Sequence, residues 1–245
     1  MNKAKFDLTG KAALITGGAS GLGLAAAERM LESGAKVLIA DYADAGQEVA
    51  DKIGASFIKV DVSKEEDVKA AVAKAVEEFG KVDIVVASAG IGGDNNAAGD
   101  ETLANWEKVN AVDYTGVMLT DRYAIEQMRK QGTGGSIINL ASMFGMVAVP
   151  TNVAYSAAKG GVVNMTRAAG THYAKEGIRV NCVAPGVIDT PLIPEDQKPI
   201  YRKLHPMGRL GESWEVGALI TFLASDDAAF ITGATIAIDG GYTAV

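Results

Sequence analysis

Cysteine and histidine are scarce in this chain of 245 residues, which holds one Cys and two His. The single cysteine, Cys182, excludes an internal disulfide, and its place in an apolar run predicts a small core side chain. No group of His, Cys and Asp has the spacing of metal ligands, so no metal is predicted. The sequence also has no run of about 18 apolar residues and no secretory-type apolar segment near its start. We therefore expect a cytoplasmic protein with no membrane partner.

Positive charge is also in short supply, because 23 Lys and Arg stand against 30 Asp and Glu and the formal net charge is -7. Nucleic acids and anionic membranes are bound by clustered Lys and Arg, so we expect no nucleic-acid partner. With 48% hydrophobic and 22% charged residues, the chain has enough apolar side chains for a continuous core. These values predict a folded protein that binds small molecules.

Short β-branched segments alternate with longer helical ones along the chain. The predicted strands are residues 12–16, 36–41, 56–62, 84–88, 136–141, 178–183 and 235–239, and the predicted helices are 21–33, 43–53, 64–79, 102–131, 152–176 and 212–224. Several strands are almost entirely apolar, as in a parallel sheet covered on both faces. We expect an α/β fold in which residues 1–245 form one doubly wound, Rossmann-type catalytic domain, with a seven-stranded parallel sheet and helices on both faces.

One long segment interrupts this alternation. Residues 185–209 contain five of the six prolines. An irregular stretch of this length in a compact domain is usually a lid or a binding loop. We therefore predict a substrate loop at about residues 186–210, with a plain surface connection as the alternative.

A glycine-rich segment, Thr16-Gly17-Gly18-Ala19-Ser20-Gly21-Leu22-Gly23, follows the first predicted strand and opens a helix. Glycines allow a tight turn and a close approach of the backbone to a pyrophosphate, whose charge meets free N–H groups at the helix N-terminus. This position between strand and helix predicts a dinucleotide site formed by Gly17, Ser20, Gly21, Leu22 and Gly23.

The second predicted strand ends at Asp41, whose carboxylate can accept hydrogen bonds from both adenosine ribose hydroxyls and repels a 2′-phosphate. No Lys or Arg lies in the glycine-rich segment or just after Asp41, where Tyr42 and Ala43 stand. The sequence therefore predicts NAD, and not NADP, as the cofactor.

Tyr155 and Lys159 lie four residues apart on a predicted helix and therefore share one face. Ser142 follows the predicted strand 136–141, at the edge where open α/β sheets bind ligands. A phenol, whose ordinary pKa is about 10, must become more acidic to exchange a proton near neutral pH, and a neighbouring ammonium has this effect. Ser142 can orient a carbonyl or an alcohol while nicotinamide exchanges a hydride. The three residues predict an NAD-dependent interconversion of a secondary alcohol and its ketone.

At these residues the sequence resembles the short-chain dehydrogenase/reductase family. The likeness covers essentially the whole chain and rests on segment 16–23, Asp61-Val62, Ala89-Gly90, Ser142, Tyr155, Lys159, Pro185-Gly186, Thr190 and segment 239–241. It implies a sheet order of 3-2-1-4-5-6-7 and a homotetramer packed through helices 102–131 and 152–176 and the C-terminal strand with residues 240–245.

The resemblance also implies how a cofactor is held. It places Asp61 and Val62 at the adenine, Lys159 at the nicotinamide ribose, and Thr190 with the backbone of Val187 and Ile188 near the carboxamide. The further expected cofactor contacts are Tyr42, Ser88, Ala89, Gly90, Tyr155, Pro185 and Gly186.

Two positions depart from the family's pattern. Ser88 stands where the family usually has the Asn of Asn-Ala-Gly, and because Ser forms fewer hydrogen bonds we expect a modest structural cost. Asp113 stands where the family normally has the Asn of its catalytic tetrad, the other members being Ser142, Tyr155 and Lys159. The resemblance implies that this residue acts chiefly through its backbone carbonyl, which every residue has. We therefore expect activity to survive and the pH profile to be the same in Asp113→Asn, with the contribution of the carboxylate left open.

In the family, the substrate pocket is lined by segments after the fourth and fifth strands and by the loop after the sixth. Here most candidates are apolar, which predicts a small or medium secondary alcohol or ketone, although core packing is the alternative for half of them. The apolar candidates are Ile91, Met143, Phe144, Val149, Val187, Ile188, Leu192, Ile193, Tyr201 and Met207; the polar ones are Asp94, Asn95, Asn96, Asn152 and His205, of which His205 is expected to be a loop residue.

Two other functions remain open at this point. One is a 3-oxoacyl-carrier-protein reductase, an activity that the family includes and that generally uses NADP. The other is a dinucleotide-binding regulator without catalysis, for which Asp113 and Ser88 would be the signs. The presence of Ser142, Tyr155 and Lys159 argues against the regulator, because a site used only for binding needs no acid.

Overall fold

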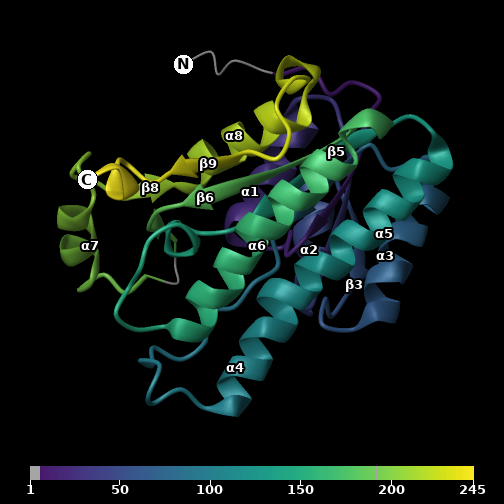
Figure 1. Ribbon diagram of the computed structural model, residues 1–245. Coiled ribbons are helices and arrows are strands. Elements are labelled where there is room, and N and C mark those ends of the chain that lie inside the picture. The colour runs from purple at the N-terminus through teal and green to yellow at the C-terminus, as the bar shows by residue number, and fades with distance from the viewer. Residues whose placement is uncertain (1–5, 191–192) are drawn as a thin grey trace.

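The computed structural model describes residues 6–190 and 193–245, and a seven-stranded parallel sheet forms its centre (Figure 1). The strands are β1 (Ala12–Thr16), β2 (Lys36–Asp41), β3 (Ser56–Lys59), β4 (Ile84–Ala87), β5 (Gly135–Leu140), β6 (Ile178–Pro185) and β9 (Thr235–Ile238). Their order is β3-β2-β1-β4-β5-β6-β9, and every neighbouring pair is parallel. With β9 as the seventh strand, this is the predicted order, and the predicted fold class is confirmed.

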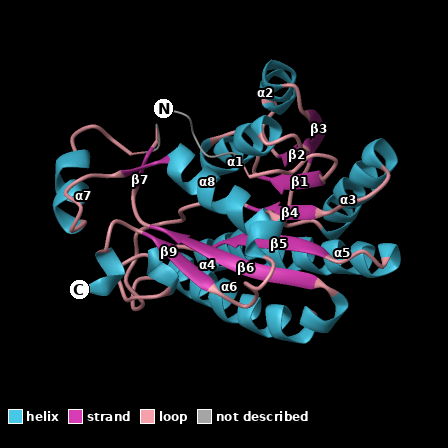
Figure 2. Ribbon diagram, turned by 90° about the horizontal axis from the view of Figure 1, so that it is seen from above, coloured by secondary structure: helices cyan, strands magenta, loops and turns pink. Residues whose placement is uncertain are grey.

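Helices cover both faces of the sheet because successive side chains of a strand point to opposite sides. Ala13 and Ile15 of β1 belong to a core cluster with α1 (Gly21–Glu32) and α8 (Ser213–Ala224). Leu14, between them, packs with α3 (Glu65–Phe79) and α5 (Gly116–Gln131) on the other face. Figure 2 shows these two layers, with α6 (Val153–His172) beside α5 and α2 (Gly46–Ile53) near β3. Cys182 is fully buried in this core, as predicted.

The predicted helix 102–131 consists of three segments: α4 (Leu103–Asn110), a π-helical turn (Ala111–Thr115) and α5. A π-helical turn accommodates one extra residue and often marks a functional site. Accordingly, buried positions recur every four residues at Asn105, Val109, Asp113, Val117 and Asp121. The turn brings Asp113 into the interior.

Several element ends differ from the prediction. β3 stops at Lys59, and not at residue 62, because its only ladder partner is β2, whose last paired residue is Asp41. α2 begins at Gly46, three residues later than predicted, and α6 ends at His172, where a short 3₁₀ turn (Ala174–Glu176) follows. These differences lie in the connections and leave the sheet unchanged.

The predicted substrate loop contains regular structure that the sequence did not suggest. It includes β7 (Ile188–Asp189), which pairs in parallel with β8 (Gly211–Glu212), and α7 (Lys198–Leu204). Pro199 lies in the first turn of α7, where proline is tolerated because that N–H has no intrahelical partner. The predicted pocket residue Leu192 lies outside the described residues.

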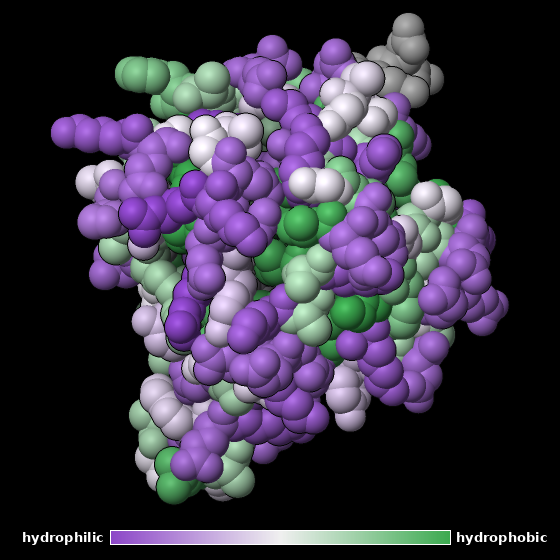
Figure 3. All heavy atoms as spheres, turned by 90° about the vertical axis from the view of Figure 1, so that its right-hand side faces the viewer, coloured by the Kyte–Doolittle hydropathy of each residue, from purple (hydrophilic) through white to green (hydrophobic). Residues whose placement is uncertain are grey.

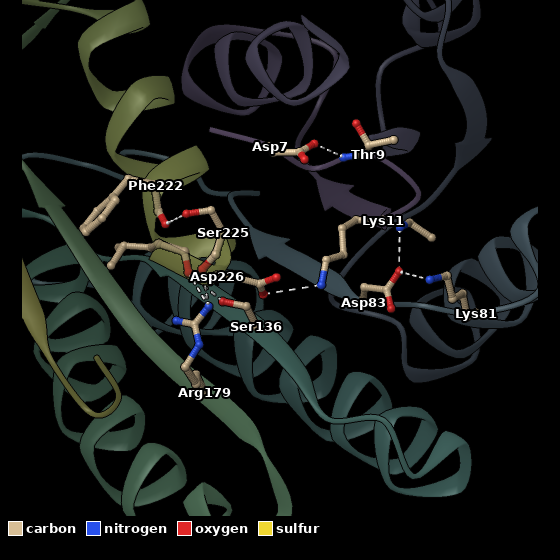
Figure 4. Close-up of polar contacts among 12 residues, drawn as sticks. Asp7, Thr9, Lys11, Lys81, Asp83, Ser136, Arg179, Phe222, Ser225 and Asp226 are labelled. Atoms are coloured by element: carbon tan, nitrogen blue, oxygen red, sulfur yellow. Dashed lines mark hydrogen bonds and ion pairs between the residues drawn. The ribbon is translucent and has the colours of Figure 1, made fainter. Parts of the chain in front are cut away.

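At the amino ends of the strands, polar contacts join β5 and β6 to the C-terminal end of α8 (Figure 4). Ser136 Oγ and Arg179 Nη2 both donate to the carbonyl oxygen of Leu223 in the last turn of α8, at 2.9 and 2.8 Å. Arg179 also donates to the carbonyl oxygen of Ser225 at 3.1 Å. These contacts satisfy carbonyls that have no partner at a helix C-terminus. The opposite edge, at the carboxyl ends of the strands, is the one where open α/β sheets bind ligands.

Candidate active site

The glycine-rich segment forms a tight turn between β1 and α1, against the turn that follows β4. Gly17 has φ 66°, and a Cβ there would lie 2.7 Å from the Cα of Ala89. A Cβ on Gly23 would lie 2.1 Å from the carbonyl oxygen of Gly17. Both positions therefore require glycine. At Gly21, with φ 52°, a Cβ would meet nothing within 4 Å, so a bound group can approach the backbone there.

The first turn of α1 is suited to an anion. Ser20 precedes the helix, is exposed and makes no capping hydrogen bond, and no acidic residue lies in the first turn. Free N–H groups and the helix dipole at this end favour negative charge. Leu22 belongs to the same turn. The residues present therefore fit the pyrophosphate of a dinucleotide.

Asp41 connects the end of β2 to the glycine-rich segment. Its Oδ2 accepts a hydrogen bond from the backbone N–H of Ala19 at 2.9 Å, and its Oδ1 accepts one from Ala43 at 2.9 Å. Each carboxylate oxygen has a further lone pair that can accept a ribose hydroxyl. Asp41 therefore has both a structural role, which the sequence did not indicate, and the geometry of a ribose ligand.

A lysine lies beside Asp41 in the sheet, although none is near it in the sequence. Lys59 is the ladder partner of Asp41 across β2 and β3. Its ammonium forms an ion pair with Asp44 and lies 5.7 Å from the ring centroid of Tyr42. Strand pairing thus places a lysine beside Asp41 that the sequence did not indicate, and the preference for NAD stays a prediction.

Asp61 and Val62 follow β3 at the same edge of the sheet. Asp61 accepts hydrogen bonds from the hydroxyl and the N–H of Ser63, at 2.6 and 3.1 Å, and the hydroxyl bond is the main cause that holds the pKa of Asp61 below its usual range. Val62 is 6% exposed and packs against Gly116 of α5. Both residues therefore lie at the same sheet edge as the glycine-rich turn, and their contact with the adenine stays a prediction.

The structure brings Tyr155 and Lys159 together on α6. Lys159 is 4% exposed, and its Nζ lies 5.5 Å from the ring centroid of Tyr155. The same Nζ donates to the carbonyl oxygen of Leu140, at the end of β5, at 3.0 Å. Ser142 follows β5, and its Oγ accepts a hydrogen bond from the N–H of Phe144 at 3.2 Å. An ammonium beside a phenol, with a hydroxyl on the adjoining turn, is an arrangement that can transfer a proton.

Asp113 is fully buried, and its carboxylate contacts Lys159. Oδ2 lies 3.2 Å from Lys159 Nζ, and Oδ1 accepts a hydrogen bond from the N–H of Ile91 at 2.7 Å. Burial raises the pKa of Asp113, and the ammonium of Lys159 opposes this effect. The sequence did not indicate this ion pair, and the catalytic role of Asp113 stays a prediction.

The segment Ser88-Ala89-Gly90 lies between the glycine-rich turn and this ion pair. The backbone N–H of Ser88 donates to the carbonyl oxygen of Thr16 at 3.2 Å. At Gly90 a Cβ would lie 3.1 Å from Asp113 Oδ2 and 3.4 Å from Lys159 Nζ. The segment therefore joins the glycine-rich turn to the ion pair of Asp113 and Lys159.

The start of the substrate loop is fixed by His205. Pro185 ends β6, and the N–H of Val187 donates to His205 Nε2 at 3.2 Å. Val187, Ile188, His205 and Met207 line one small cavity of about 60 Å³ together with Gly186 and residues 238–240. Thr190 is half-buried at the end of β7. Because both ring nitrogens of His205 contact backbone atoms, it is not free to bind a substrate hydroxyl.

Of the other predicted pocket residues, some lie beside Tyr155 and others are buried in the core. Ile91 packs in one cluster with Tyr155, whereas Met143 is 2% exposed and belongs to the core, so the packing alternative holds for Met143. Asn152 precedes α6 with φ 62°, a left-handed conformation that costs energy outside glycine, and its Oδ1 is buried without a partner. Asn152 is thus a strained polar residue three positions before Tyr155.

Within residues 6–190 and 193–245, no group of three or more His, Cys, Asp and Glu side chains could hold a metal ion. In the same part of the chain, no helix has the length and apolar character needed to cross a bilayer.

The chain is similar in sequence to several known oxidoreductases. A family model described as Enoyl-(Acyl carrier protein) reductase matches residues 17–243. The chain is 42% identical over 243 residues to the cis-4-hydroxycyclohexanecarboxylate dehydrogenase of Sinomonas cyclohexanicum, covering 96% of this chain and 97% of that one. It is 39% identical over 248 residues to the NADP-dependent (R)-specific alcohol dehydrogenase of Lentilactobacillus kefiri, covering 97% and 98%.

Among solved structures, the crystal structure of gox2181 has a TM-score of 0.93 to this chain. The two are 34% identical, and the match covers 98% of each chain. The chain is therefore similar to known proteins in sequence and in fold over nearly its full length.

Proposed function

Since this chain belongs to the short-chain dehydrogenase/reductase family, we propose that it is an NAD-dependent dehydrogenase that interconverts a secondary alcohol and its ketone. The observation that carries the proposal is the buried Lys159 ammonium, 5.5 Å from the ring centroid of Tyr155. This pair lies at the sheet edge that also carries a glycine cradle suited to a pyrophosphate.

In this proposal, bound nicotinamide supplies the acceptor or donor of the hydride. Tyr155 Oη takes the hydroxyl proton of the alcohol during oxidation and returns it to the carbonyl oxygen during reduction. Lys159 stabilises the phenolate, and Ser142 Oγ donates a hydrogen bond to the substrate oxygen, where charge develops. Asp113 holds Lys159 through their ion pair, and Ile91 forms part of the apolar wall next to Tyr155.

A cyclic secondary alcohol is the substrate class that the similar cis-4-hydroxycyclohexanecarboxylate dehydrogenase suggests. The test is the absorbance of NADH during incubation of the purified protein with NAD and a panel of linear and cyclic secondary alcohols. Turnover of a cyclic alcohol is expected. The description of the matching family model favours an acyl-carrier-protein substrate as the second candidate, so the panel includes a 3-oxoacyl thioester with NADPH. Reduction of the thioester alone would replace the first proposal by the second.

The wild-type protein is expected to prefer NAD to NADP because the Asp41 carboxylate repels a 2′-phosphate. We expect Asp41→Ala to weaken this preference by about tenfold, which corresponds to about 1.4 kcal/mol, and the double variant with Tyr42→Arg to tend toward NADP. Lys59→Gln should strengthen the wild-type preference, because it removes the cation beside this position. The measurement is kcat/KM with each cofactor. Equal or better kcat/KM with NADP in the wild type would show that the carboxylate argument is wrong.

The ion pair between Asp113 and Lys159 changes what we expect of Asp113→Asn. A carboxylate 3.2 Å from Lys159 Nζ offsets the positive charge that makes Tyr155 a better acid. The rate of alcohol oxidation is expected to rise with pH as Tyr155 loses its proton. Removing the carboxylate should shift this rise to lower pH by half a unit or more, which is about 0.7 kcal/mol. The measurement is the oxidation rate against pH for both proteins. Superimposable profiles would show that only the backbone carbonyl of residue 113 matters.

We further propose that the protein is a homotetramer. Four large hydrophobic side chains of the helical stretch from α4 to α5 are exposed: Leu103, Trp106, Tyr114 and Met118. Figure 3 looks onto the side where α3 and α5 lie and shows hydrophobic surface among hydrophilic atoms. Sedimentation at micromolar concentration is expected to give a species of four times the chain mass. A single species of 25.3 kDa would contradict the proposal.

A further inference from the structure

The imidazole of His205 joins two segments of the chain that are far apart in sequence. The residue follows α7 and is 3% exposed. Its Nδ1 lies 2.7 Å from the carbonyl oxygen of Tyr201, and its Nε2 lies 3.2 Å from the backbone nitrogen of Val187. Both ring nitrogens are therefore occupied by backbone groups.

These contacts determine which nitrogen carries the proton. The backbone N–H of Val187 can only donate, so Nε2 accepts. The carbonyl oxygen of Tyr201 can only accept, so Nδ1 is protonated and donates. His205 is thus a neutral imidazole whose two hydrogen bonds have opposite direction, a combination that a side chain without both a donor and an acceptor cannot provide.

The surroundings of the ring connect it to both ends of the site. A Cβ on Gly186 would lie 2.7 Å from His205 Nε2 and 2.8 Å from the Cα of Asp239, so the start of the substrate loop is held between them. The ring of Tyr242 lies 5.7 Å from that of His205 and 6.4 Å from that of Phe144. Phe144 in turn donates its N–H to Ser142.

We propose that His205 is a positioning residue for the nicotinamide half of the cofactor. Its hydrogen bond fixes the backbone of Val187, and therefore of Ile188, at the position where the carboxamide is expected. This inference rests on the proposed function, which supplies the ligand. The residue touches neither substrate nor cofactor and acts through Val187.

The test compares two ligands that differ only in the nicotinamide ring. NADH and ADP-ribose are titrated against the full-length wild type, His205→Phe, His205→Asn and His205→Gln. The Phe side chain keeps an aromatic ring beside Tyr242 but leaves the Val187 N–H and the Tyr201 carbonyl without partners, and the shorter Asn cannot reach both. We expect His205→Phe and His205→Asn each to bind NADH about tenfold more weakly and ADP-ribose unchanged. The Gln side chain has an acceptor and a donor and should restore part of the NADH affinity.

His172→Phe is the matched control, because His172 is the other histidine of the chain, is exposed and lies at the end of α6. It should change neither affinity. NADH affinity within about twofold of wild type in both His205→Phe and His205→Asn would overturn the inference, as would an equal loss for both ligands, which indicates general destabilisation. Absence of NADH binding to the wild type itself would instead refute the proposed function, and this inference with it.

Discussion

Replacement of Tyr155 by Phe is expected to lower kcat for alcohol oxidation by about a thousandfold and to leave NADH affinity within about twofold. The reason is that, in the proposed function, the phenol serves proton transfer, whereas the glycine-rich turn, Asp41 and the loop after β6 are the proposed holders of the cofactor. Phe keeps the ring against Ile91 and Ala154 in the small apolar cluster that contains Tyr155, so packing is preserved. Steady-state turnover and a direct NADH titration check both halves of this expectation.

The control is Tyr173→Phe, the same substitution at the end of α6, which should have no effect on kcat. Retained activity in Tyr155→Phe would refute the mechanism. Lys159→Ala is a less specific probe, because it leaves the Asp113 carboxylate buried without its counter-ion, which typically costs about 3–5 kcal/mol of stability. The double variant Lys159→Met with Asp113→Asn removes both charges and therefore separates loss of catalysis from loss of stability.

Replacement of Asp121 by Asn is expected to raise stability above pH 7. Asp121 is 4% exposed on α5, and its Oδ2 accepts a hydrogen bond from Asn139 Nδ2 at 2.9 Å. Its Oδ1 and the Oδ1 of Asn139 are buried without partners. A protonated carboxyl or an amide has an N–H or O–H that can donate in this cluster, whereas an ionised carboxylate has none. Burial raises the pKa of Asp121 to about 7.

The sign of the pH effect follows from the difference between the folded and unfolded states. The ordinary pKa of 3.8 applies when the chain is unfolded and about 7 when it is folded, so between these values the folded state binds more protons. Stability therefore falls as pH rises from about 4 to about 7, by about 4 kcal/mol for a difference of about three pKa units. Asp121→Asn should remove this loss, with little effect at pH 4.

Urea unfolding of both proteins at pH 5 and pH 8 measures the effect. The stability gain of Asp121→Asn should be larger at pH 8 than at pH 5, and the exposed control Asp227→Asn should give no such difference. An equal change at both pH values would mean that Asp121 does not titrate in this range.

The sequence predicted those features that depend on local pattern. Apolar strand runs located all seven strands of the main sheet, and the position of Gly17 to Gly23 after β1 located the glycine-rich turn. Tyr155 and Lys159 are four residues apart on one helix, so their proximity also followed from the sequence. In each case the residues that form the pattern lie in one short continuous segment of the chain.

The features that sequence reasoning missed depend on contacts between distant residues. Lys59 lies beside Asp41 only through the register of β2 and β3, and the contact of His205 with Val187 forms only because the loop returns to the end of β6. The ion pair of Asp113 with Lys159 depends on the π-helical turn, which apolar periodicity does not distinguish from an α-helix. The run of prolines suggested an irregular loop, yet Pro199 sits in the first turn of a helix.

The π-helical turn at Ala111–Thr115 has a consequence for how this site can change over evolutionary time. Such a turn is an α-helix that has gained one residue, and each residue added to or removed from a helix rotates the rest of that helix by about 100°. Deletion of one codon after Asp113 within this turn would leave a continuous α-helix, with α5 still packed on the sheet and Asp113 and α4 rotated about the helix axis. The Asp113 carboxylate would then turn away from Lys159, so a single insertion or deletion is enough to connect or disconnect this charge and the active site.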